Sequence, residues 1–240
     1  MPPEGLPLPA ESRGDLPRGG ALRRLVLGIA ASYAAAWAIG IGFGYGLKGT
    51  QWWDGGARWE LLLLRAFHRS LPPWLDHAMI ASVYLGTNLV ILPAMLALGL
   101  WLWRVRHAPL VAIHLLVVCV GALSMNATMK HLLDRDRPTL FPSRGMYAWA
   151  SYPSGHLILT TALYFTGALM LQRARGWRWP FVVAALMVVI TCYSRLYLSV
   201  HWPTDLLGGL QIGVVWLIGT WKAFTIFDAR LRARRMAITA

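Results

Sequence analysis

Cysteine and acidic side chains are scarce in this sequence, and both scarcities narrow the class of protein. Only two cysteines, Cys119 and Cys192, occur among the 240 residues. Both lie inside apolar stretches, so we expect buried thiols and no disulfide bond. Ten acidic residues stand against 23 Lys and Arg, which gives a formal charge of +13. The basic residues form no single patch and no nucleic-acid-binding motif, which argues against a DNA or RNA partner.

Apolar sequence is abundant instead. Hydrophobic residues make up 57% of the chain, which contains 13 Trp and has a mean hydropathy of +0.49. This composition is too apolar for a soluble α/β domain and indicates a polytopic membrane protein. Six apolar stretches each approach the ~20 residues that cross a bilayer, so we expect an all-α bundle of six transmembrane helices. The stretches are 25–47, 78–103, 108–129, 155–172, 180–198 and 204–225.

The ends of the chain differ from its middle. Residues 1–20 contain five Pro and four Gly and are predicted to be a disordered cytoplasmic tail. Residues 227–240 form a basic cytoplasmic tail, which leaves 21–226 as one membrane domain without an internal repeat. Within the first stretch, Gly40, Gly42, Gly44 and Gly46 predict close packing on another helix.

The distribution of Lys and Arg predicts the orientation. With the N-terminus in the cytoplasm, 14 of the 23 Lys and Arg lie on the cytoplasmic side. Positive charge is expected to favour that side of a membrane protein. We therefore expect a multi-pass protein of the inner (plasma) membrane with both termini in the cytoplasm.

The outer loop between the first two stretches, residues 48–77, contains a further amphipathic segment. Trp52, Trp53 and Trp59 lie near an apolar run at 61–64, and Arg58 and Arg65 recur at helical spacing. A helix lying in the membrane interface has this composition. A loop that covers the end of the bundle is the alternative.

Three short polar segments interrupt the apolar chain beside the ends of its stretches. Charges are costly in a bilayer, so their clustering on one side suggests a functional site. In the first segment, Lys130 precedes Arg137 by seven residues, or two helical turns, and Pro138 is expected to end the helix. An ammonium and a guanidinium suit phosphate oxygens, although ordinary charge beside a membrane is an alternative. Arg135 is expected to pair with neighbouring Asp134 or Asp136, or to be solvated.

The second segment is Pro153-Ser154-Gly155-His156, directly before the fourth stretch. The start of a helix offers free N–H groups and favours an anion. Ser154 suits the N-cap position, and Gly155 permits close approach of the backbone to a ligand. His156 is then placed to donate a proton. A cap with no further role is the alternative.

The third segment joins Ser194-Arg195 to His201 and Asp205. Pro203 is predicted to begin the last helix, so Asp205 lies in its first turn and can reach back to the His201 ring. A carboxylate on one ring nitrogen leaves the other as the better nucleophile or base. A structural His–Asp cap is the alternative.

Together the segments read Lys-x6-Arg-Pro, Pro-Ser-Gly-His and Ser-Arg-x5-His-x3-Asp. This pattern resembles the three-part signature of the type 2 phosphatidic acid phosphatase superfamily, and the six-helix layout is similar to its bacterial membrane members. The resemblance implies a metal-independent lipid phosphatase without a cofactor. In it, His201 is the nucleophile, Asp205 orients it and His156 protonates the leaving group. The phosphate is bound by the remaining signature residues, Lys130, Arg137, Ser154, Gly155 and Arg195.

The expected substrate is a phosphomonoester or diphosphate of a lipid, because the site lies near the outer headgroup level of the membrane. The sequence does not separate isoprenoid diphosphate, phosphatidylglycerophosphate, phosphatidic acid and lipid A, nor does it indicate an oligomeric state. A lipid phosphotransferase of the same superfamily would use the same residues. A transporter is less favoured, because ionisable groups are few within the central stretches, where Asn88 and Asn126 suit hydrogen bonds between helices.

Overall fold

The computed structural model describes residues 19–68, 72–83, 88–142 and 149–239. Regular structure within these ranges is entirely helical, which confirms the predicted all-α class. The helices are α1 (Gly20–Lys48), α2 (Trp52–Gly55), α3 (Arg58–Phe67), α4 (Pro73–Ala81), α5 (Asn88–Arg104), α6 (Pro109–Leu133), α7 (Gly155–Arg175), α8 (Trp179–Tyr197) and α9 (Pro203–Thr239). The predicted N-terminal tail lies outside the described residues up to residue 18.

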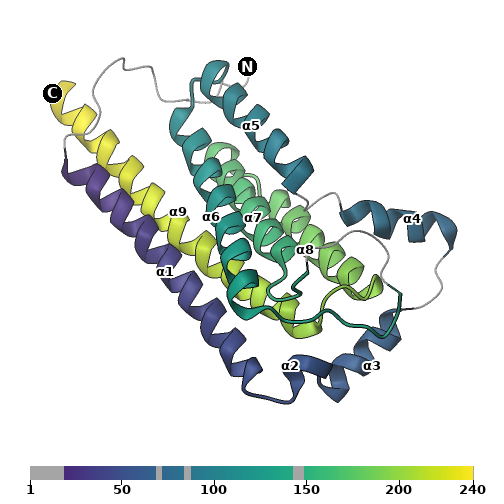
Figure 1. Cartoon of the computed structure of the whole chain (residues 1–240). Coiled ribbons are helices and arrows are strands. Elements are labelled where there is room, and N and C mark those ends of the chain that lie inside the picture. The colour runs from purple at the N-terminus through teal and green to yellow at the C-terminus, as the bar shows by residue number, and fades with distance from the viewer. Residues whose placement is uncertain (1–18, 69–71, 84–87, 143–148, 240) are drawn as a thin grey trace.

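The long helices form a bundle in which α6 and α7, and α7 and α8, run antiparallel, whereas α7 and α9 run in the same direction. Helix α9 packs along α1 and α7, α7 also contacts α6 and α8, and α5 lies against α6 (Figure 1). Five helices in the described ranges, α1, α6, α7, α8 and α9, are long and apolar enough to cross a membrane. Helix α9 continues past the predicted end of the last span, so that 227–239, expected as a tail, prolong the helix.

The predicted second span, 78–103, is not one helix. Helix α4 ends at Ala81, and α5 begins at Asn88 and has 17 residues, about 25 Å of rise against a hydrocarbon core of about 30 Å. The end of α4 is instead held against α8. Ser194 Oγ donates to the carbonyl of Met79, and Ser82 Oγ donates to Ser194 Oγ at 2.5 Å. Contacts between distant segments therefore override the continuous apolar pattern.

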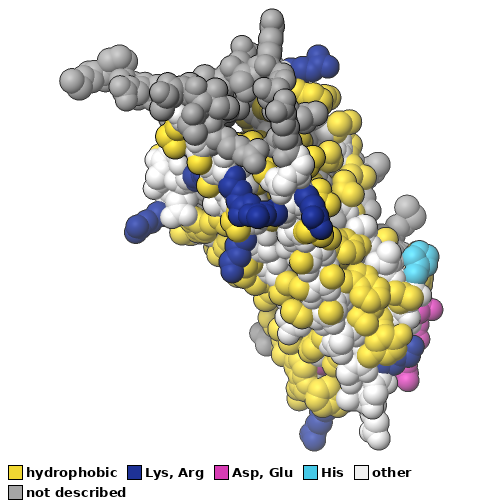
Figure 2. Space-filling model, turned by 90° about the vertical axis from the view of Figure 1, so that its left-hand side faces the viewer, with side chains coloured by type: hydrophobic (Ala, Val, Ile, Leu, Met, Phe, Trp, Pro, Cys, Tyr) yellow, Lys and Arg dark blue, Asp and Glu magenta, His cyan; other side chains and the backbone are white. Residues whose placement is uncertain are grey.

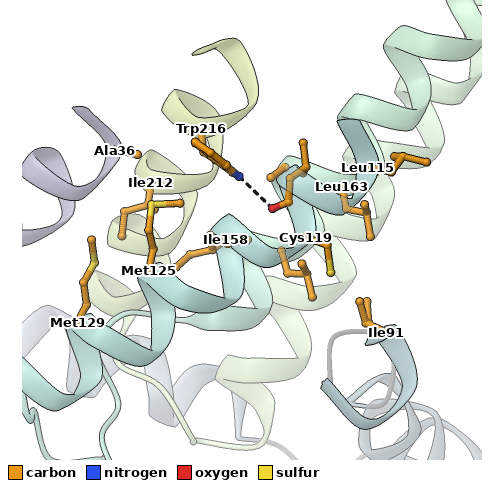
Figure 3. Close-up of a cluster of buried hydrophobic side chains, with 14 residues drawn as sticks. Ala36, Ile91, Leu115, Cys119, Met125, Met129, Ile158, Leu163, Ile212 and Trp216 are labelled. Atoms are coloured by element: carbon orange, nitrogen blue, oxygen red, sulfur yellow. Dashed lines mark hydrogen bonds between the residues drawn. The ribbon is translucent and has the colours of Figure 1, made fainter. Parts of the chain in front are cut away.

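The core of the bundle lies where α6, α7 and α9 meet. Trp216 fills its centre and donates its indole N–H to the carbonyl of Val118 at 3.0 Å (Figure 3). Met125, Ile158 and Ile212 pack around it, all fully buried. Cys119 is buried in the same core as a free thiol. This packing fixes how the helices lie against one another, and hence which of their ends come together.

Apolar side chains also cover much of the outer surface. Figure 2 shows hydrophobic side chains over much of one side of the molecule, with most of its visible Lys and Arg in the upper half. On α5 and α8, Leu96, Val182 and Val189 are each more than 60% exposed. Burial of such residues in lipid accounts for exposure that would be costly in water.

The amphipathic segment of the first outer loop is helical and covers one end of the bundle. Helix α3 packs on α8 and α9, and its Leu64 is fully buried against Leu157, Trp202 and Leu206. Its opposite side exposes Trp59. The structure thus shows the covering role of this segment, while its place in the membrane interface stays a prediction.

Two glycines near the end of α1 provide a test of the packing. A Cβ at Gly44 would lie 2.5 Å from Leu133 Cδ1 and 3.0 Å from the Tyr152 ring, whereas Gly46 has open space around it. We predict that Gly44→Ala destabilises the protein by about 1–3 kcal/mol through overpacking. Gly46→Ala is the matched control and leaves stability unchanged or slightly raised, since Ala favours helix. Thermal unfolding in detergent measures both, and equal melting temperatures would contradict the close approach.

Candidate active site

Four helix ends meet at one end of the bundle, below the α8 label in Figure 1. Helices α6 and α8 end there, and α7 and α9 begin there. The three polar segments predicted from the sequence are attached to these ends. They are therefore brought together by the packing of the bundle, although they span residues 130 to 205.

His201 and Asp205 lie side by side in the turn that begins α9. The Nδ1 atom of His201 is 3.4 Å from Oδ2 of Asp205, and both side chains are buried. Pro203 occupies the first position of the helix. The same Oδ2 accepts a hydrogen bond from the backbone N–H of Trp202 at 2.8 Å. The turn thus places Nδ1 of His201 beside the carboxylate, although no described group forms a hydrogen bond with it, and leaves Nε2 on the other side of the ring.

Arg135 is the residue that sequence reasoning misjudged most. It was expected to pair with Asp134 or Asp136 or to be solvated, but it is fully buried. Its Nη1 donates to Asp205 Oδ1 at 2.8 Å and to Thr204 Oγ1 at 2.7 Å. The prediction was wrong because α6 ends at Leu133 and the next residues turn inward, away from the helix axis.

Glu60 on α3 is the second residue that the sequence did not reveal. It is fully buried, and its Oε1 accepts from both the backbone N–H and the hydroxyl of Thr204, at 3.0 and 2.7 Å. Its Oε2 lies 3.7 Å from Arg135 Nη2. Glu60 is the only acid in an otherwise apolar and basic helical segment, and that isolation was the one signal that could have indicated a buried partner.

Lys130 and Arg137 converge on the same carbonyl. Lys130 Nζ donates to the carbonyls of Ala150 and Ser151, at 2.6 and 3.2 Å, and Arg137 Nη2 donates to Ala150 at 3.1 Å. Arg137 Nη1 also donates to the carbonyl of Val200, next to His201. Arg137 reaches this position from a non-helical segment, because Asp134, with a φ of +47°, already ends α6. The prediction that Pro138 ends this helix was therefore wrong.

Ser154 and Gly155 begin α7, with the Ser154 N–H donating to the carbonyl of Asp205 at 3.1 Å. Ser154 occupies the N-cap position, but its side chain makes no capping bond and its buried hydroxyl has no partner among the described residues. Gly155 leaves room for Asn126, whose amide would lie 2.6 Å from a Cβ there. Asn126 Oδ1 accepts no hydrogen bond from the described part of the chain, unlike the bond between helices expected for it.

The side chains of His156 and Arg195 lie next to each other. Arg195 is almost fully buried, and its Nη1 is 3.4 Å from His156 Nε2. Its Nη2 donates to Ser194 Oγ at 2.9 Å. His156 Nε2 also lies 3.1 Å from the carbonyl of Val83, which contributes the α4 end to the site. All eight residues predicted from the sequence are therefore close to this one region.

The electrostatic environment favours a neutral His201. Burial lowers the pKa of His201 well below its usual value, and the positive charges of Arg137 and Lys130 lower it further. A neutral imidazole retains the lone pair that a nucleophile needs. An excess of fixed positive charge also suits a ligand with several negative oxygens, such as a phosphate.

Metal binding has no cluster of ligands to support it in the described residues, where no group of three or more His, Cys, Asp and Glu could hold an ion. Asp205 and Glu60, the buried acids near the site, are both directed at Arg135.

Comparisons with known proteins identify the family of the chain. A model of the PAP2 superfamily matches residues 109–227, which include all three polar segments. YbjG of Escherichia coli, a candidate undecaprenyl-diphosphatase, is 31% identical over 163 residues, which cover 65% of this chain and 76% of the relative. Phosphatidylglycerophosphatase B of Bacillus subtilis is 28% identical over 148 residues, covering 60% and 72%.

The fold has a solved counterpart as well. The crystal structure of a transmembrane PAP2-type phosphatidylglycerolphosphate phosphatase from Bacillus subtilis superposes with a TM-score of 0.69. The match covers 83% of this chain and 96% of the other at 22% identity. Motifs, family model, relatives and fold agree, and the chain is an integral multi-pass membrane protein that belongs to the PAP2 superfamily.

Proposed function

We propose that this protein removes phosphate from a lipid phosphomonoester or diphosphate through a phospho-histidine intermediate on His201. The observation that carries the proposal is the buried His201–Asp205 pair, at 3.4 Å, in a region where three fixed cations converge. Nε2 of His201 attacks phosphorus, and the bond from phosphorus to the leaving oxygen breaks. Asp205 stabilises the imidazolium that this attack creates.

His156 is the proton donor in this scheme. It gives a proton to the leaving alcohol or phosphate and takes one from the water that later cleaves the P–N bond. Arg195, 3.4 Å away, lies where it can hold both His156 and an oxygen of the phosphate. The proton taken from water restores His156 for the next cycle.

The remaining signature residues bind the phosphate. Lys130 and Arg137 supply positive charge, and the Ser154 hydroxyl, which has no partner in the described ranges, supplies a donor. The N–H of Gly155 lies at the start of α7, where the helix dipole favours an anion. These groups are held before the substrate binds and stabilise charge as it develops on the non-bridging oxygens.

A lipid substrate is supported by the position of the site at the ends of membrane-spanning helices. Relatives named for undecaprenyl diphosphate and phosphatidylglycerophosphate support the same class. We further propose that α5 completes a six-helix membrane domain, with both termini in the cytoplasm and the site at the outer face of the plasma membrane. The Lys and Arg distribution supports this orientation.

Phosphate release from purified protein tests the function. Undecaprenyl diphosphate, phosphatidylglycerophosphate, phosphatidic acid and lipid A are the substrates, and we expect at least one to release phosphate. We predict that His201→Ala and His156→Ala abolish release, at least about 10³-fold, because nucleophile and acid are lost. His77→Ala, an exposed histidine on α4, is the control and retains activity. Full activity in His201→Ala would refute the mechanism, and phosphate transfer to a second lipid without release would favour the phosphotransferase.

The pH profile tests the environment of His201. Activity requires its neutral form, which is lost as pH falls through the folded pKa. Because burial and the cations lower that pKa, we expect the acid limb due to His201 well below pH ~6.5, the ordinary value. Arg137→Gln removes one cation and moves the limb upward, besides lowering activity. Exposed Arg58→Gln controls for ionisation of the substrate. An unmoved limb in Arg137→Gln would contradict this electrostatic coupling.

Chelation tests whether the cations suffice. We predict full activity in excess EDTA, because Lys130, Arg137 and Arg195 supply the positive charge that a metal would otherwise supply. The measurement is phosphate release before and after chelation and dialysis. A loss restored by Mg²⁺ would require a metal in the reaction.

A further inference from the structure

Arg135 donates four hydrogen bonds to groups of the protein. Besides Asp205 and Thr204 at Nη1, Nε donates to the carbonyl of Trp53 at 3.1 Å and Nη2 donates to that of Trp52 at 2.8 Å. The second Nη2 donor faces Glu60 at 3.7 Å. A guanidinium has five N–H donors, so four are used by hydrogen bonds and the fifth faces the Glu60 carboxylate at ion-pair distance. Arg135 is therefore held mainly by groups of the protein, with Asp205 among them.

The segment from the first outer loop encloses Arg135. Its guanidinium carbon lies 5.3 Å from the Trp53 ring and 5.4 Å from the Trp202 ring, within the range of cation–π attraction. Gly56, between α2 and α3, has a φ of +73°, and a Cβ there would overlap the Trp202 ring. The loop is thus fitted closely to the residue that follows His201.

Glu60 binds the other side of the same turn. It accepts two hydrogen bonds from Thr204, the residue before Asp205, while its Oε2 accepts from the backbone N–H of Ala57 at 2.9 Å. One end of the carboxylate therefore secures the first turn of α9, and the other secures the start of α3. Both carboxylates, Glu60 and Asp205, lie against the single guanidinium of Arg135.

Burying three charges is costly, and replacing such clusters by apolar residues often leaves stability unchanged or improves it. Stability alone is therefore a weak reason for this cluster. Its geometry suggests another: Oδ1 of Asp205 is taken by Arg135, which turns Oδ2 toward Nδ1 of His201.

We infer that Arg135 and Glu60 are positioning residues that hold Asp205 charged and directed at His201. The α2–α3 segment, which carries Glu60, thereby supports the turn that contains His201 and Asp205. The inference rests on the proposed function. Without Arg135 the buried carboxylate loses the cation that lies against it and is favoured to take up a proton. Protonated Asp205 cannot stabilise the imidazolium that forms when His201 attacks phosphorus.

Kinetics of single variants test the inference. Arg135→Gln and Glu60→Gln are compared with the wild type using the lipid that it hydrolyses. We expect kcat to fall about 10–100-fold, as for other residues that orient a reactive group. KM stays within about twofold, because the cations that bind phosphate are untouched and uniform binding is kept. Controls are the exposed neighbours Asp134→Asn and Arg58→Gln, which leave both constants unchanged.

Two further readouts separate positioning from mere support of the fold. The acid limb of kcat/KM moves to higher pH in Arg135→Gln, and Arg135→Lys, which restores the charge without the fork, moves it back. Arg135→Gln combined with Asp205→Asn loses no more activity than Asp205→Asn alone, since the two act as a unit.

Three outcomes would overturn the inference: unchanged kcat in folded Arg135→Gln and Glu60→Gln, a loss confined to KM, or additive losses in the double variant. Size-exclusion profiles in detergent identify folded protein, and Glu60→Gln and Arg135→Lys decide the matter if Arg135→Gln aggregates. Failure of the proposed function is distinct, because the wild type would then release no phosphate or His201→Ala would remain active.

Discussion

The buried carboxylate of Asp205 is the point on which the site depends. Its side chain accepts from Arg135 and from the backbone of Trp202, and it lies beside His201. Its own carbonyl accepts from the backbone of Ser154 at 3.1 Å. All three polar segments therefore meet at one residue, each through a different group. A carboxylate without solvent must have such partners, because an unpaired buried charge costs several kcal/mol.

The bundle supplies the frame that makes this meeting possible. Helix packing brings the ends of α6 and α8 to the starts of α7 and α9. Gly40 and Gly44 allow α1 to lie close to the neighbouring side chains. Tyr152, between the first two segments, donates its hydroxyl to the carbonyl of Gly40 on α1 at 2.6 Å. Burial, together with the charge of Asp205, raises the pKa of this tyrosine and keeps the hydroxyl a donor. This hydrogen bond attaches the segment before α7 to α1.

Prediction from the sequence succeeded where a local pattern has one physical meaning. Apolar stretches of sufficient length predicted α1, α6, α7, α8 and α9. Prediction failed where a distant contact decides. The apolar run at 78–103 was divided because Ser82 and Met79 bond to Ser194 on α8. Ser154 does occupy the predicted N-cap position of α7, but the Asp205 carbonyl accepts its N–H, and its hydroxyl makes no capping bond.

The sequence by itself determined the membrane class, the five long spans and the family, because hydropathy and the spacing of signature residues are properties of the chain. It also identified Lys130, His201 and the other signature residues as candidates. Only the tertiary structure decided that Arg135 and Glu60 belong with them. Their partners lie about 70 and 144 residues away, and burial of a charge depends on which segments close over it. A local sequence pattern does not predict which distant segments will bury Arg135 and Glu60.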